Sequence, residues 1–152
     1  MLTPVDWDAR YRLQAGWTRD LRQYAYRQAA LPRAGRVLEV GCGTGAILAD
    51  FRGDAQPDAF GIDIDRAALR QAQRAVEFAH LTAADALALP FADGVFGITL
   101  CHFFLLWAAR PEIVVREMVR ITRPGGAVLV LAEPDYGGRI DYPPPLERLG
   151  AL

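Results

Sequence analysis

Residues Val37 to Gly45 read VLEVGCGTG, and this stretch decides the class of fold that we expect. Its first half is apolar apart from one Glu, as a short buried strand requires, and its second half carries Gly41, Gly43 and Gly45. Because glycine lacks a Cβ atom, the backbone can turn tightly there and a ligand can lie against the main chain. The N–H groups at the start of a following helix are free to bind such a ligand. The stretch therefore predicts a strand, a turn and a helix, with a binding site at the turn.

Short apolar strands alternate with helical segments on both sides of this turn. Such alternation predicts a three-layer α/β domain in which a mostly parallel sheet of about five strands has right-handed crossovers. The ligand site of such a domain lies at the carboxyl ends of the strands. The expected strands span residues 36–40, 59–62, 78–82, 95–101 and 127–131, and the expected helices span residues 6–30, 46–51, 65–77 and 111–123.

The same pattern divides the chain into three parts. Residues 1–34 are expected to form an N-terminal helical cap, and residues 35–133 are expected to form the ligand-binding core. Residues 134–152 contain paired glycines and three consecutive prolines, which predict an irregular tail.

The composition excludes several chemistries. All 17 basic residues are Arg, and the chain has no Lys, Ser or Asn. A Schiff-base lysine, a Walker A lysine and a Ser-His-Asp triad are therefore excluded. A formal net charge of −1 gives no basic surface, so a nucleic-acid partner is not expected.

The two cysteines and the apolar runs bear on metal binding, disulfides and cellular location. Cys42 and Cys101 have no further ligand at metal-binding spacing, so we expect neither a metal site nor a disulfide. No signal-peptide pattern is visible, and no apolar run reaches the roughly 20 residues of a membrane span. We therefore expect a cytoplasmic protein without a membrane span.

Two classes of cofactor compete for the glycine-rich turn. Gly41, Gly43 and Ala46 also satisfy the G-x-G-x-x-A pattern of NAD(P)-binding oxidoreductases, and Asp63 follows at a suitable distance to hold a ribose. Asp85 follows the third expected strand, where its carboxylate can accept a hydrogen bond from an adenine amine. An acidic mouth suits the cationic S-adenosylmethionine better than an anionic pyrophosphate. The carboxylates therefore favour S-adenosylmethionine, and an NAD(P)-binding oxidoreductase remains the alternative.

Four motifs then follow one another in a specific order, namely VLEVGCGTG at 37–45, GIDID at 61–65, DALALPF at 85–91 and RPGG at 123–126. In this combination the chain resembles the class I S-adenosylmethionine-dependent methyltransferases over residues 36–132. It is most similar to their type 11 branch, which includes methyltransferases of quinone biosynthesis. The resemblance implies a Rossmann-like methyltransferase fold with strand order 3-2-1-4-5. It also implies S-adenosylmethionine as cofactor and transfer of its methyl group to a small molecule by in-line displacement.

The resemblance, read with the residue types, assigns roles at the cofactor site. Asp63 is expected to hold the ribose, Asp85 to read the adenine, and Glu39 to fix the glycine-rich turn or the ammonium group of the cofactor. Ile64 and Leu87 are expected to close on the two faces of the adenine ring. The expected cofactor-binding residues are Glu39, Gly41, Cys42, Gly43, Gly45, Asp63, Ile64, Asp85, Ala86, Leu87 and Cys101.

The candidate catalytic residue is His102, which follows the fourth expected strand at the mouth of the site. It is placed to contact the methyl acceptor or to act as a base, and packing against Phe103 and Phe104 is the structural alternative. Methyl transfer depends mainly on positioning, so a sufficiently nucleophilic acceptor needs no base.

Two features depart from the resemblance. Gly97 occupies a position at which these families often have Asp, a change that we expect to affect strand packing. The chain also ends before the antiparallel hairpin that normally follows strand five, which leaves residues 127–131 as an uncovered edge. Either the chain is truncated, or the tail, a second copy in a homo-oligomer, or a partner chain covers this edge. A catalytically inactive binding or assembly module is the third functional alternative.

Overall fold

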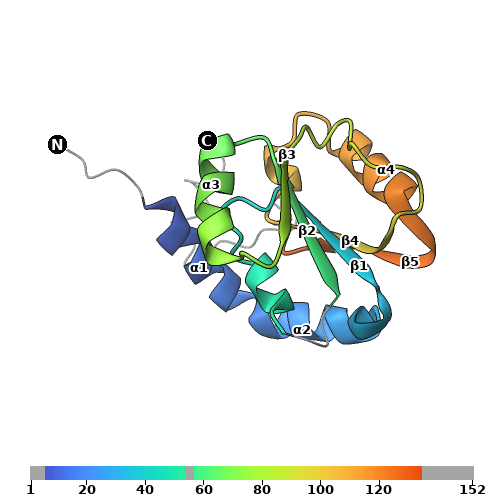
Figure 1. The fold of residues 1–152 in the computed structure, drawn as a ribbon, viewed down its shortest axis with the longest axis horizontal. Coiled ribbons are helices and arrows are strands. Elements are labelled where there is room, and N and C mark those ends of the chain that lie inside the picture. The colour runs from blue at the N-terminus through green and yellow to red at the C-terminus, as the bar shows by residue number, and fades with distance from the viewer. Residues whose placement is uncertain (1–5, 54–56, 135–152) are drawn as a thin grey trace, which may run out of the picture.

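The computed structural model describes residues 6–53 and 57–134. These residues form a five-stranded sheet in the order β3-β2-β1-β4-β5, and all four strand pairings are parallel (Figure 1). The order confirms the predicted Rossmann-like fold. The strands are β1 (Arg36–Val40), β2 (Asp58–Asp63), β3 (His80–Ala83), β4 (Phe96–His102) and β5 (Thr122–Leu131).

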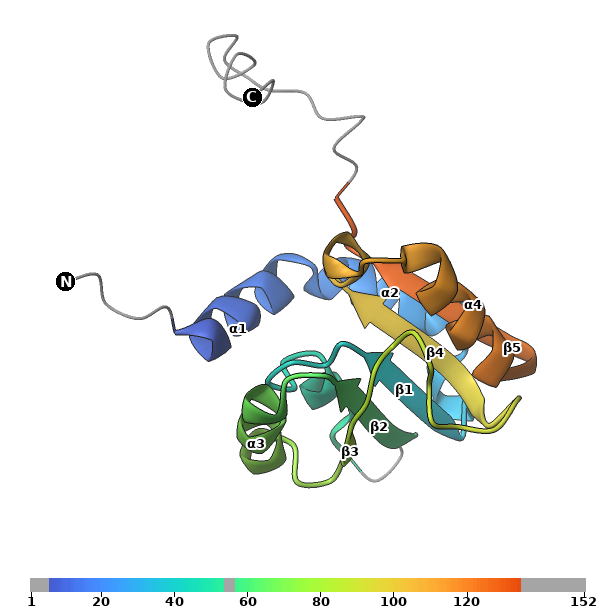
Figure 2. The ribbon, with the colours of Figure 1, turned by 90° about the horizontal axis from the view of Figure 1, so that it is seen from above.

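Helices pack on both faces of this sheet and make the predicted three layers (Figure 2). One face buries Val37 and Ile98 together with side chains of α1, α2 and α3, whereas the other face buries Leu38 together with side chains of α4. The helices are α1 (Trp7–Trp17), α2 (Arg19–Gln28), α3 (Arg66–Ala75) and α4 (Pro111–Ile121), with three short 3₁₀ helices, η1 (Leu31–Arg33), η2 (Leu48–Phe51) and η3 (Leu105–Trp107).

Local sequence signals set the starts of the two crossover helices. Asp65 caps α3, because its carboxylate accepts hydrogen bonds from the N–H groups of Ala67 and Ala68 at 2.7 and 3.3 Å. Pro111 occupies the first turn of α4, where the missing N–H would have no partner within the helix. Both starts agree with the sequence prediction.

Strand β4 passes so close to the end of η1 that position 97 admits no side chain. A Cβ atom on Gly97 would collide with the backbone carbonyl of Ala34. Glycine at position 97 thus allows the backbone of β4 to lie close to the backbone of Ala34. This is an effect on packing, in line with the expectation for this position.

The prediction of a single helix over residues 6–30 is wrong, because two helices meet at Thr18. The backbone of Thr18 leaves the helical region with φ −108° and ψ 10°. The nearest partners of its side chain lie outside α1, since the Oγ1 atom lies 2.7 Å from His102 Nε2 and accepts a hydrogen bond from Arg22 at 2.8 Å. Ser and Thr side chains that bond elsewhere compete with helix continuation.

The prediction of an α-helix over residues 46–51 is also wrong. The segment forms only η2, in which Asp50 N–H donates to the carbonyl of Ile47 at 2.9 Å, a bond of the 3₁₀ type. A short 3₁₀ turn brings the chain back toward the start of β2.

Strand β5 begins earlier than expected. Thr122 already pairs with Phe96, and pairing resumes with Ala127 opposite Ile98, so the RPGG segment forms an irregularity within the strand. Regular pairing over 127–131 agrees with the predicted fifth strand.

Two expectations concern features that the described ranges do not contain. Within residues 6–53 and 57–134, no helix is long and apolar enough to cross a membrane, and no group of three His, Cys, Asp or Glu side chains is placed to hold a metal ion. The predicted tail spans residues 134–152, of which residues 135–152 lie outside the described residues.

Candidate cofactor and acceptor site

The glycine-rich turn lies where β1 ends, beside the end of β2. The N–H groups of Gly41 and Cys42 both donate to the carbonyl of Ile62 at 2.9 Å, which fixes the turn to the neighbouring strand. Gly41 and Gly43 have φ of 73° and 51°, in the left-handed region that favours glycine. A Cβ on Gly43 would also lie 3.3 Å from the ring of Tyr11 in α1. The turn therefore leaves a narrow space that side chains would fill.

Asp63 at the end of β2 holds this turn in place. Its Oδ2 accepts a hydrogen bond from Gly43 N–H at 2.8 Å, and its Oδ1 accepts one from Asp65 N–H at 2.8 Å. A carboxylate oxygen can accept more than one hydrogen bond, so both oxygens retain capacity for a ligand. The residue expected to bind ribose thus also anchors the glycine-rich turn.

A cavity of about 690 Å³ opens at this end of the sheet, between α1 and the segment that follows β4. The volume lies in the range of small-molecule and cofactor sites. It brings together six of the twelve residues that the sequence predicted for the site. The cavity is lined by Trp7, Arg10, Tyr11, Gln14, Glu39, Gly41, Cys42, Gly43, Ala46, Ile47, Asp63, His102, Phe103, Phe104, Leu106, Trp107 and Pro134.

Glu39 supplies a buried carboxyl group to this cavity. The residue is 2% exposed, and its Oε2 atom has no hydrogen-bond partner among the described residues. Burial, reinforced by the nearby negative charge of Asp50, raises the pKa of Glu39 well above its ordinary value. A buried polar atom without a partner is costly, so this oxygen marks a place where a ligand donor would be stabilised.

His102 lines the same cavity from the end of β4. Its Nε2 lies 2.7 Å from Thr18 Oγ1. Burial lowers the pKa of His102 to about 4, and the positive charge of Arg22 acts in the same direction. The imidazole is therefore neutral at physiological pH.

The remaining predicted residues do not line this cavity. Ile64 is 74% exposed, and Asp85 is also exposed and accepts a hydrogen bond from Leu87 N–H at 2.9 Å. Cys101 is fully buried, and burial raises the pKa of its thiol to about 12. Gly45 packs against α3 instead, where a Cβ would meet Val76. The residues outside the cavity lining are Gly45, Ile64, Asp85, Ala86, Leu87 and Cys101.

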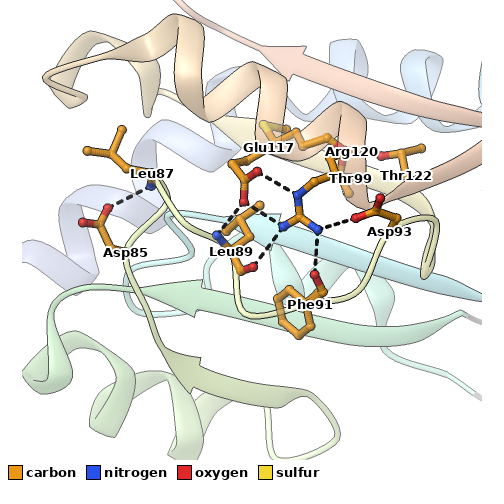
Figure 3. A network of polar contacts seen from close by, with 10 residues as sticks. Asp85, Leu87, Leu89, Phe91, Asp93, Thr99, Glu117, Arg120 and Thr122 are labelled. Carbon is orange, nitrogen blue, oxygen red and sulfur yellow. Dashed lines mark hydrogen bonds and ion pairs between the residues drawn. The ribbon is translucent and has the colours of Figure 1, made fainter.

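The segment that carries Asp85 is nevertheless joined to α4 by hydrogen bonds from its second half, at Leu89, Phe91 and Asp93 (Figure 3). Arg120 donates to the carbonyls of Leu89 and Phe91 at 3.1 and 2.8 Å and pairs with Asp93 at 2.8 Å. Glu117 accepts from Leu89 N–H at 2.8 Å. These contacts fix the loop whose sequence, DALALPF, carried part of the resemblance.

Several site residues were missed by the sequence analysis. Tyr11 and Gln14 reach the cavity from α1, and Phe104 lies over Gly41 so closely that a Cβ there would collide with its ring. Glu133 fixes this region, because its carboxylate accepts from the N–H groups of Phe104, Leu105 and Leu106 at 2.7, 2.9 and 3.3 Å. The position of Glu133 two residues after a predicted strand was the signal available for it.

Comparisons with known proteins agree with this arrangement. The family model described as "Methyltransferase domain" matches residues 38–130. The chain belongs to this methyltransferase family. Its members use S-adenosylmethionine as methyl donor, and membership favours this cofactor over NAD(P).

Individual relatives give the same result. A demethylmenaquinone methyltransferase of Renibacterium salmoninarum is 32% identical over 127 residues, covering 82% of this chain and 53% of the relative. A phosphatidylethanolamine N-methyltransferase of Cereibacter sphaeroides is 36% identical over 105 residues, covering 65% of this chain and 51% of the relative. The methyltransferase domain described here thus spans about half the length of these curated relatives.

Solved structures share the fold. A Bacillus halodurans protein described as a methyltransferase superposes with a TM-score of 0.63 at 26% identity, covering 68% of this chain and 47% of that protein. The cyclase SpnF superposes with a TM-score of 0.65 at 26% identity, covering 72% of this chain and 43% of that protein. Because a cyclase is among these neighbours, the reaction must be argued from the site rather than from the fold.

Proposed function

We propose that this chain binds S-adenosylmethionine at the glycine-rich turn and transfers its methyl group to a small molecule held in the same cavity. The observation that carries the proposal is the buried Oε2 of Glu39, which has no hydrogen-bond partner among the described residues. Glu39 lines the cavity together with Gly43 and Asp63. This set fits the cofactor, because a carboxyl group suits an ammonium group and the glycines leave room for the methionine part.

The predicted division of labour among the acidic residues is retained in the proposal. Asp63 has capacity to accept from the ribose hydroxyls, because each of its oxygens accepts only one N–H group among residues 6–53 and 57–134. Asp85 uses Oδ1 in a local turn and keeps Oδ2 for the adenine amine. Ile64, exposed at the end of β2, is an apolar surface that an adenine ring would cover.

The cavity walls support an apolar or aromatic acceptor. S-adenosylmethionine supplies a methyl group on a positively charged sulfur, and a nucleophilic acceptor displaces that sulfur in line. Tyr11, Phe104 and Trp107 present aromatic surface to the cavity. His102 contacts the acceptor from the end of β4. Positioning by these walls is the main contribution that methyl transfer requires.

Isothermal titration with S-adenosylhomocysteine, with NAD as the parallel ligand, tests the proposed cofactor. We expect micromolar binding of S-adenosylhomocysteine and no heat from NAD. A folded sample that binds NAD alone, or neither ligand, contradicts the proposed function. Circular dichroism on the same sample establishes that it is folded.

We also propose that a second copy or a partner chain covers the outer edge of β5. Among the described residues, β5 pairs only with β4, and Val130 on this strand is 42% exposed. Unpaired strand edges favour association with another chain. Sedimentation equilibrium at micromolar concentration tests this, because a monomer under these conditions contradicts self-association. The cytoplasmic location stays a prediction.

A further inference from the structure

The break between α1 and α2 brings Thr18 to the proposed acceptor site. Thr18 and His102 are 84 positions apart in the sequence, yet Thr18 Oγ1 lies 2.7 Å from His102 Nε2. The break that the sequence analysis did not predict thus has a specific structural consequence at His102.

The hydrogen atoms of this contact can be assigned from the donors around Thr18. Arg22 Nη1 donates to Thr18 Oγ1 at 2.8 Å, and a guanidinium group can only donate. The Thr18 hydroxyl proton therefore points to one of its acceptors, which are His102 Nε2 at 2.7 Å and the carbonyls of Gln14 and Ala15 at 3.4 and 3.5 Å. The imidazole is much the nearest of the three, and this distance favours Nε2 as the acceptor of the hydrogen bond.

Arg22 is held in place as the donor to Thr18 Oγ1 by several partners of its own. It is 2% exposed, pairs with Asp50 at 2.8 and 3.3 Å, and donates to the carbonyl of Ala15 at 2.6 Å. Tyr26 donates to the same Asp50 carboxylate at 3.3 Å. The charged groups that face His102 are thus Arg22 and Asp50. Arg22 opposes protonation of His102, whereas Asp50 favours it but is paired with Arg22. The lowered pKa of His102 agrees with this arrangement.

The second ring nitrogen is left for a ligand. No acceptor for His102 Nδ1 occurs among residues 6–53 and 57–134, and Nδ1 is not among the buried atoms of this part of the chain that lack a partner. With respect to this part of the chain, an atom with neither property is accessible to solvent. Since His102 lines the cavity, this nitrogen can reach a molecule bound there.

We propose that Thr18 and Arg22 hold His102 as a neutral imidazole with its proton on Nδ1, so that His102 donates a hydrogen bond to the methyl acceptor and does not act as a base. Thr18 is a positioning residue in this scheme, and His102 is the residue that touches substrate. The donor suits an acceptor with a carbonyl or phenolate oxygen near the reacting atom. The inference rests on the proposed function only in placing the acceptor in this cavity.

Nitrogen-15 NMR of the full chain tests the tautomer without any cofactor or acceptor. The chain has two histidines, so His80→Gln identifies the signals of His102. We expect the Nδ1–H tautomer at neutral pH and no titration of His102 between pH 5.5 and 8. A ring protonated on Nε2, or one that titrates in this range, overturns the proposal.

Thr18→Val and Thr18→Ser separate the hydroxyl from the shape of the side chain. Valine removes the donor, so we expect a mixed tautomer and a rise of about one pH unit in the titration midpoint of His102. Serine retains the donor and should restore the wild-type signals. Thr82→Val, on the exposed strand β3, is the matched control. Unchanged tautomer and midpoint in Thr18→Val overturn the proposal.

Titration of the wild-type chain with S-adenosylhomocysteine distinguishes the failure of this inference from the failure of the proposed function. If the wild-type chain shows the Nδ1–H tautomer but binds no S-adenosylhomocysteine, the proposed function fails while the arrangement of His102 stands. If the wild-type chain binds the ligand but His102 carries its proton on Nε2, only the present inference fails.

Discussion

Asp63 is the single residue on which both the glycine-rich turn and the proposed ribose contact depend. It accepts one hydrogen bond from the turn at Gly43 and one from the start of the next helix at Asp65. Because these bonds fix the direction of the carboxylate, a ribose would meet preorganised acceptors. Preorganisation of this kind reduces the entropy lost on binding.

Asp63→Ala should therefore weaken binding of S-adenosylhomocysteine. Loss of the charged acceptor is expected to cost about 2 kcal/mol, or roughly 30-fold in affinity. Asp58→Ala is the matched control, because Asp58 lies at the opposite end of the same strand and is exposed. Isothermal titration of both variants measures the difference. Equal affinities in the wild type and Asp63→Ala would rule out the ribose assignment.

Gly97 is important for packing rather than for the site. Gly97→Ala should lower the free energy of unfolding by about 3 kcal/mol, because its Cβ would collide with the carbonyl of Ala34 and force a backbone shift. Gly16→Ala is the control, since a Cβ there meets nothing within 4 Å and Gly16 lies within helix α1. Urea unfolding should show a stability equal to or above wild type for the control. A wild-type midpoint for Gly97→Ala would contradict the close approach.

At the scale of elements, the site is closed by two segments that the sheet does not itself provide. Helix α1 lies beyond the carboxyl ends of the strands (Figure 2), and η3 follows β4 on the other side of the cavity. Each is held by long-range hydrogen bonds, from Thr18 to His102 and from Glu133 to the backbone of Phe104. The shape of the acceptor cavity therefore depends on contacts between elements.

Glu133→Ala should loosen η3 without unfolding the sheet. Three backbone N–H groups would lose their acceptor, which is expected to cost about 1–3 kcal/mol. Hydrogen exchange should become faster at Phe104, Leu105 and Leu106. Glu112→Ala, at an exposed ion pair on α4, should leave these amides unchanged. Unaltered protection in Glu133→Ala would show that packing alone holds the segment.

At the scale of the whole molecule, burial of ionisable groups links stability to pH. The pKa of His102 falls from 6.5 to about 4 in the folded state, so the unfolded chain binds this proton more readily. The contribution of neutral His102 to the stability of the fold is therefore fully present above pH 6.5 and is lost as the pH falls towards 4. Glu39, whose pKa is raised above 4.5, acts in the opposite direction, because its contribution is lost as the pH rises.

A variant without the histidine isolates its part of this balance. Between pH 7 and pH 5 the wild type should lose more stability than His102→Asn, since the contribution of Glu39 is common to both. Urea unfolding at the two pH values measures the difference. If the two proteins lose the same stability, His102 is not held in the neutral state by the fold.

The sequence by itself determined the alternation of strands and helices, the glycine-rich turn and the placement of Glu39, Asp63 and His102 around it, whereas the strand order was implied by the family resemblance. These features follow from local patterns, because a buried strand, a run of glycines and a strand-end carboxylate are each written within a few consecutive residues. In a parallel sheet, such strand ends necessarily meet at one edge.

Only the tertiary structure decided the break at Thr18, the replacement of the expected helix over 46–51 by η2, and the part that Glu133 plays at the cavity. Thr18 bonds to a residue 84 positions away, and Glu133 to one 29 positions away. Local propensity cannot encode such partners, because the free energy of each bond depends on where the rest of the chain places the other group.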